Sequence, residues 1–177
     1  MIYLATYEPG GSLYNREREH ILGRSLLNFG LMKEYGRTWE VEQETGSNHV
    51  LRVQRTWNLI SAIQGGLVVC AVADRALGVD TERIRPFKEG LMRRVCSESE
   101  RGFVLEGRSE AARQERFFRL WTLKESFVKA IGRGLAFSAG GHYIFTGGGR
   151  CKGSIPGWRF YQSRVYQSYI ILRLRGG

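Results

Sequence analysis

The chain has 177 residues, of which 42% are hydrophobic, so it can bury the core of one domain or of two tightly fused small halves. Its net charge of +10 lies in residues 76–177, which carry 19 Lys and Arg against 9 Asp and Glu, whereas residues 1–75 carry 8 of each sign. This uneven charge predicts a polyanionic partner, which could be a nucleic acid, a phosphorylated cofactor or an acidic protein surface.

The sequence predicts a cytoplasmic protein. The longest apolar run, residues 67–73, is far too short to cross a membrane. No signal peptide is expected, because the N-terminus lacks a basic start before an apolar stretch. The 3 cysteines are widely spaced, odd in number and without zinc-binding spacing, which fits reduced thiols best.

Hydrophobic patterning in the first half of the chain predicts several strands and one amphipathic helix. Residues 57–66 are compatible with either type of element. Residues 67–73 are apolar on both faces, as expected of a central strand that is covered on both sides. The predicted strands are residues 2–7, 39–44, 50–53 and 67–73, and the predicted helix is residues 16–34.

A second strand is predicted over residues 77–82, where the chain returns after a turn at residues 74–75. Because side chains alternate along a strand, Asp80 and Glu82 are expected on one face, with Gly78 leaving open space beside them. The other face would then carry Leu77, Val79 and Thr81.

Three helices follow, and their ends carry recognisable signals. Ser97 and Glu100 form a capping-box pattern, Ser109 is a suitable N-cap, and glycine follows the last apolar residue of the long helix. Trp121 in that helix is expected to be a core residue. The predicted helices are residues 89–95, a helix through residue 105 and a helix through residue 131, and the predicted strands are residues 142–146, 158–162 and 166–174. These elements indicate an α+β fold of antiparallel hairpins with packed helices.

Five charged residues could form a phosphate-processing site. Asp80 and Glu82 repel each other unless something neutralises them, and Mg²⁺, which takes carboxylate and phosphate oxygens, does so well. Glu125 could complete the site, and Lys124 and Lys129 could bind phosphate. The alternative is that the two acidic residues lie on an exposed sheet face, and that Glu125 and Lys129 form an ordinary exposed ion pair one helical turn apart. If the repulsion dominates, removing Asp80 should be neutral or mildly stabilising without metal.

Two motifs resemble those of a known family. Residues 78–86, GVDTERIRP, and residues 120–135, LWTLKESFVKAIGRGL, look like the signatures GxDxE and W-[ST]-x-K-E-[SA]-x-x-K of 4′-phosphopantetheinyl transferases. The match is closer to the larger Sfp-type branch of that family. The resemblance covers residues 67–137, extends to the C-terminal strands and is faint over the first 55 residues.

The resemblance implies a reaction and a set of site residues. Family members transfer the phosphopantetheine arm of coenzyme A to a serine of an acidic acyl or peptidyl carrier protein, with Mg²⁺, and release 3′,5′-ADP. Asp80, Glu82 and Glu125 resemble the metal ligands, and Glu125 could also help to deprotonate the serine. Lys124 and Lys129 resemble the residues that contact phosphate. The catalytic candidates that the resemblance implies are Glu125 and Lys129. The implied fold is two similar halves, about residues 1–75 and 76–177, in a monomer.

The first half departs from the family pattern. Residues 57–64 read WNLISAIQ where the family has N-[IL]-S-H-S, so Ser61 or Ile63 stands where a phosphate-binding histidine is expected. The upstream lysine and proline of the family are also missing. Arg24 and Arg52 are the candidates for replacement phosphate contacts.

Two alternatives remain open at this point. One is a non-catalytic member of the family that binds a carrier protein or a nucleotide. The other is a small basic nucleic-acid-binding protein, although most aromatic residues occur in apolar contexts and are not interleaved with Lys and Arg on one strand face.

Overall fold

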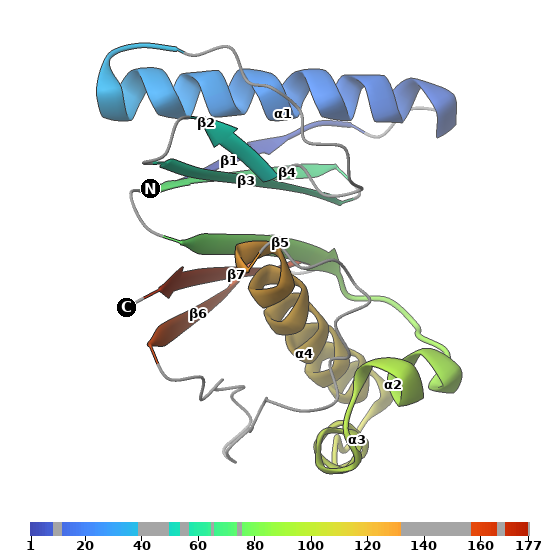
Figure 1. Ribbon diagram of the computed structural model, residues 1–177. Helices are drawn as coiled ribbons and strands as arrows, with labels where there is room; N and C mark the ends of the chain where they lie inside the picture. Colours follow the sequence, from blue (N-terminus) through green and yellow to red (C-terminus); the bar gives the residue numbers. More distant parts are fainter. Residues whose placement is uncertain are drawn as a thin grey trace.

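The computed structural model describes residues 1–8, 12–38, 50–53, 57–64, 66–73, 76–131, 157–165 and 169–176 (Figure 1). The strands predicted at residues 39–44 and 142–146 lie outside this part of the chain. Within it, no helix has both the length and the apolar character needed to cross a membrane.

The first sheet is formed by residues from the N-terminal part of the chain. Its strand order is β1-β4-β3-β2, and each neighbouring pair is antiparallel. The ambiguous stretch from residue 57 is the strand β3, and helix α1 packs against the sheet. The bounds are β1 Ile2–Thr6, α1 Ser12–Tyr35, β2 Val50–Val53, β3 Trp57–Gln64 and β4 Leu67–Ala73.

The second sheet has the strand order β5-β7-β6, again with antiparallel neighbours. The strand that follows β4 therefore does not pair with it but begins this other sheet. Helices and antiparallel strands together confirm the α+β class, whereas the similarity of the two halves stays a prediction. The bounds are β5 Leu77–Arg83, α2 Glu89–Val95, α3 Glu98–Leu105, α4 Glu110–Ala130, β6 Trp158–Val165 and β7 Tyr169–Gly176.

The strand β4 is apolar on both faces because it lies between a helix and the other sheet. On one face, Cys70 and Val72 pack against Leu27 and Leu31 of α1. The other face packs against Leu77 and Val79 of β5, joining the two sheets through one core. Figure 1 shows the resulting layers, with α1 beyond the first sheet and α4 against the second. The residues of β4 in the shared core are Leu67, Val69, Ala71 and Ala73.

The two N-cap predictions are confirmed, whereas the glycines expected to end the long helix lie outside the described residues. Ser97 caps α3 with both bonds of a capping box: its Oγ accepts from the Glu100 N–H, and its own N–H donates to Glu100 Oε2 at 2.7 Å. Ser109 caps α4, because its Oγ accepts from the Ala112 N–H at 3.1 Å.

An aromatic core holds α4 against α2 and α3. Phe117 and Phe118 are fully buried, and Phe87 stacks on Phe117 with ring centroids 4.2 Å apart. Trp121 packs at the margin of this core and is only partly buried, with its ring centroid 6.0 Å from that of Phe117. Trp121 thus packs with the core as the sequence predicts, but from its edge.

Helix α4 crosses β5 at Gly78, where the two backbones come unusually close. A Cβ atom built on Gly78 would collide with the backbone carbonyl of Ser126. The space that the sequence suggests beside Asp80 is therefore filled by the helix itself. The missing side chain lets α4 approach the strand closely enough for its last turns to reach the carboxylates of β5.

We expect the Gly78→Ala variant to lose at least about 1–3 kcal/mol of unfolding free energy, because the added methyl group meets backbone that cannot rotate away. The matched control is Gly102→Ala in α3, where a Cβ meets nothing within 4 Å. That change should stabilise the protein by about 0.5–1 kcal/mol through helix propensity. Urea denaturation measures both, and a Gly78→Ala variant as stable as the parent chain would contradict the close approach.

Candidate functional site

A buried ion pair connects β5 to α4. Asp80 is 5% exposed and Lys129 is 8% exposed, and the Lys129 Nζ donates to Asp80 Oδ1 at 2.7 Å. The lysine reaches the strand because it lies in the last turn of a helix that Gly78 allows to lie close. Within the described residues Lys129 forms its ion pair with Asp80 and not with Glu125, so the ordinary helical pair that the sequence allowed is absent.

The second carboxylate oxygen of Asp80 is a buried acceptor with no hydrogen-bond partner among the described residues, and the same holds for the hydroxyl of Thr81. Burial raises the pKa of Asp80 to about 6, against the opposing effect of the Lys129 ammonium and with a further rise from Glu82. Leaving a buried acceptor unpaired is costly, so Asp80 Oδ2 indicates a site for a ligand.

Glu82 and Glu125 complete an acidic cluster around Asp80. Glu82 lies two residues further along β5 and accepts a bond from Arg85 Nη1 at 2.8 Å. Glu125 is half-buried one turn before Lys129, and burial raises its pKa to about 7, with further rises from Asp80 and Glu82 and an opposing effect of Lys129. Glu82 and Lys129 thus act on the pKa values of both Asp80 and Glu125, as expected when these four side chains lie near one another.

The donor set of this cluster fits a hard divalent cation. Its three carboxylates outnumber the Lys129 ammonium and the Arg85 guanidinium together, and Asp80 Oδ2 has no hydrogen-bond partner among the described residues. In the described residues no three His, Cys, Asp or Glu side chains are already spaced as a metal cage. Mg²⁺ does not need one, since it commonly takes one or two protein carboxylates and completes its shell with water and phosphate oxygens.

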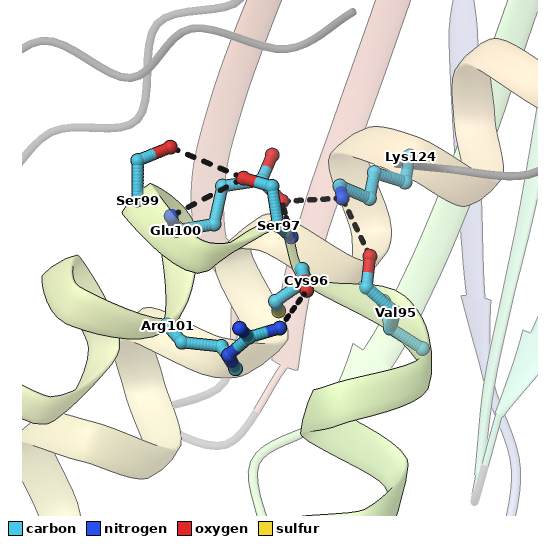
Figure 2. A network of polar contacts seen from close by, with 7 residues as sticks. All are labelled: Val95, Cys96, Ser97, Ser99, Glu100, Arg101 and Lys124. Carbon is cyan, nitrogen blue, oxygen red and sulfur yellow. Dashed lines mark hydrogen bonds and ion pairs between the residues drawn. The ribbon is translucent and has the colours of Figure 1, made fainter. Parts of the chain in front are cut away.

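Lys124 lies on another side of α4 (Figure 2). Its Nζ is 2.6 Å from Glu100 Oε2 and 2.6 Å from the carbonyl oxygen of Val95, and the residue is 2% exposed. The structure thus brings Lys129 to the acidic cluster and takes Lys124 into an ion pair with α3. The phosphate contact implied for Lys124 stays a prediction that would require this pair to open. The capping-box pattern identified Glu100 as a helix cap, but nothing local in the sequence pointed to its lysine partner.

The two arginine candidates lie in the part of the chain that forms α1 and the first sheet. Arg24 is exposed on α1, and Arg52 lies in β2 opposite Asn58 of β3. Where β3 pairs with β4, Ser61 is opposite Cys70 and Ile63 is opposite Val68. Contacts of Arg24 and Arg52 with phosphate stay predictions.

Comparisons with known proteins include the part of the chain that carries the acidic cluster. Residues 76–146 match the model of the 4′-phosphopantetheinyl transferase superfamily. The chain is 32% identical over 124 residues to the 4′-phosphopantetheinyl transferase psf-1 of Bacillus pumilus, covering 68% of this chain and 52% of the relative. It is 29% identical over 130 residues to a 4′-phosphopantetheinyl transferase of Bacillus subtilis, covering 70% and 57%. Over 72 residues it is 32% identical to the Sfp protein of Bacillus subtilis strain 168, covering 41% and 32%.

The chain spans about half the length of two of these relatives, psf-1 of Bacillus pumilus and the 29% identical transferase of Bacillus subtilis. The region that matches the family model contains β5 and α4, and hence Asp80, Glu82, Glu125 and Lys129. In this region the chain is similar to the 4′-phosphopantetheinyl transferase superfamily, and among its members it is similar to those of the Sfp type.

Proposed function

We propose that this protein transfers the 4′-phosphopantetheine arm of coenzyme A to a serine of an apo acyl or peptidyl carrier protein, with Mg²⁺, and releases 3′,5′-ADP. The observation that carries the proposal is the acidic cluster of Asp80, Glu82 and Glu125 beside Lys129, inside the region that matches the family model. Phosphoryl transfer depends mainly on positioning and charge neutralisation, which such a cluster supplies.

Each residue of the cluster is given a role. Asp80, Glu82 and Glu125 would hold the cation, which when bound neutralises charge on the pyrophosphate of coenzyme A. Lys129 holds Asp80 in place and brings a positive charge to the phosphates. Glu125 would accept the serine proton directly or through a water molecule, because it is the carboxylate on α4 beside Lys129 in the proposed site.

The basic second half of the chain suits both partners. Residues 76–177 carry the whole net charge of +10, and the phosphates of coenzyme A and the surface of an acidic carrier protein are both negative. We propose that the protein acts as a monomer in the cytoplasm.

A second candidate function is a family member that binds without catalysis. It is favoured by the missing histidine in residues 57–64, where β3 carries Ser61 and Ile63. Incubation with coenzyme A, Mg²⁺ and a panel of apo carrier proteins separates the two. A carrier that gains the mass of one phosphopantetheine arm supports the enzyme, and no gain on any carrier, with intact binding, supports the second function.

We expect Glu125→Gln to lower the transfer rate by at least about a hundredfold, since it removes a proton acceptor and a proposed metal ligand. The melting temperature without metal should be unchanged or higher, because a partly desolvated carboxylate is replaced by a neutral group. The matched control is Glu106→Gln, which changes an exposed residue whose Oε2 lies 3.7 Å from Arg116 Nη1. A Glu125→Gln enzyme with full activity would contradict the proposal.

Asp80 is expected to behave differently from Glu125. The ion pair with Lys129 overturns the expectation that removing Asp80 is neutral without metal, because the lysine ammonium would be left buried and unpaired. Asp80→Ala is therefore a poor test of function, since it should also destabilise the fold.

Without metal, the stability of the protein should fall as the pH rises from about 4 to 7. The pKa of Asp80 is raised from 3.8 to about 6 and that of Glu125 from 4.5 to about 7, so the folded state holds these protons more tightly than the unfolded chain. Their contribution is most favourable below the unfolded pKa values and is lost as the pH rises through the folded ones. Melting curves in a chelator should show a smaller fall for Glu125→Gln than for the parent chain. Identical pH profiles would contradict the raised pKa.

Coenzyme A and dephospho-coenzyme A should bind with affinities within about tenfold of each other, because the expected histidine and lysine contacts are missing and one charge-assisted hydrogen bond is worth about 1.5–3 kcal/mol. Calorimetry with Mg²⁺ measures both. If Arg24 replaces a lost contact, Arg24→Gln should weaken coenzyme A binding only. A much larger preference for coenzyme A would show that the first half keeps a strong 3′-phosphate site.

A further inference from the structure

The ion pair between Lys124 and Glu100 is the second strongly buried ion pair of the described residues, and the proposed reaction does not use it. Its side chains are 3% and 2% exposed. It lies where α4 meets the corner between α2 and α3 (Figure 2). Lys124 and Lys129 are five residues apart on α4, which separates their directions by about 140° around the helix. Lys124 nevertheless belongs to the motif that carries Glu125 and Lys129.

A single ammonium joins three helices at this corner. Lys124 Nζ donates to the carbonyl oxygen of Val95, the last residue of α2, and to Glu100 Oε2 in the first turn of α3. The same Oε2 accepts the Ser97 N–H at 2.7 Å, so the capping box of α3 and the anchor of α4 share one oxygen. Arg101 Nη1 also donates to the carbonyl oxygen of Cys96 at 3.0 Å, which fixes the turn between α2 and α3.

A buried ion pair is poor evidence of stabilisation, because apolar residues of similar size often serve as well or better. What such a pair can supply is directional geometry, since its bonds form only in one arrangement of the helices. We propose that Lys124 is a positioning residue, which sets the rotation and the axial position of α4 so that Glu125 and Lys129 face Asp80, rather than a residue that binds phosphate.

The position of Glu125 between two anchored neighbours supports this role. Lys124 ties the helix to α2 and α3, and the carbonyl of Ser126 lies against Gly78 of β5. Helix α4 is therefore held at Lys124 and at Ser126, the two residues on either side of Glu125. A small rotation of α4 would move Glu125 and Lys129 together with respect to β5.

A thermal double-mutant cycle tests the ion pair itself and does not depend on the proposed function. Lys124→Met should lower the melting temperature by roughly 6–12 °C, because it leaves Glu100 buried and unpaired. The double variant Lys124→Met/Glu100→Gln should recover most of that loss, since the glutamine keeps an acceptor for the Ser97 N–H. The matched control is Arg93→Met, which breaks an ion pair on α2 whose side chains are 69% and 67% exposed and should leave the melting temperature unchanged.

The double variant also separates a positioning role of Lys124 from a purely structural role and from a role in binding phosphate. Calorimetry should show Mg²⁺ binding at least about tenfold weaker than in the parent chain, as expected when the support of a ligand is lost. Coenzyme A affinity should fall with it, because Lys129 and the bound cation are both proposed to act on the phosphates. Unchanged affinities for both Mg²⁺ and coenzyme A would reduce the pair to a structural contact, and a tenfold or larger loss of coenzyme A affinity with unchanged Mg²⁺ affinity would make Lys124 a phosphate ligand. Either result would overturn the proposal.

One readout remains valid even if the transfer reaction is not found. The ¹⁵N signal of the Lys129 ammonium reports its bond to Asp80, and it should shift or broaden in the double variant if α4 has moved. An unchanged Lys129 signal would overturn the positioning role, whereas a parent chain that binds neither Mg²⁺ nor coenzyme A would contradict the proposed function alone.

Discussion

The bond between Lys129 and Asp80 is the contact on which the candidate site depends. It joins two residues 49 positions apart, in a helix and a strand of the second half, and both are almost completely buried. Two charges are taken out of water at a large cost, which only good geometry and further partners can offset. Among the described residues one oxygen of Asp80 has no hydrogen-bond partner, and Glu82 and Glu125 add negative charge near it. The pair therefore neutralises the cluster only in part and leaves it suited to a cation.

The layers of the fold explain why these charges gather at one place. The strand β5 buries Leu77 and Val79 against β4, so its alternate side chains are directed toward α4. Gly78 lets the helix approach, and the aromatic core with the Lys124–Glu100 pair holds the other side of the helix. Strand alternation, one glycine and two buried ion pairs thus act together to set the positions of Glu125 and Lys129 relative to Asp80.

Local signals in the sequence predicted much of this structure, but they could not predict which residues far apart in the sequence contact each other. The capping box of α3, the N-cap of α4, the long helix and the buried strand β4 follow from spacing within a few residues, and the motifs identified all four residues of the cluster. The sequence could not show that β5 leaves the sheet of β4, because both strands carry similar apolar residues. It also could not show that the two motif lysines have different partners, since Asp80 and Glu100 lie 49 and 24 residues away from them. Contacts of Arg24 and Arg52 remain predictions.

We propose that Asp80, Glu82 and Glu125 hold a divalent cation next to coenzyme A, and a crystal structure of the protein with both ligands tests this site most directly. We expect a cation bonded to oxygens of Asp80, Glu82 and Glu125 at about 2.0–2.1 Å, the distance for magnesium, and to a pyrophosphate oxygen of coenzyme A. A bound coenzyme A whose pyrophosphate lies away from β5 and α4, or a cation held by other residues, would contradict it.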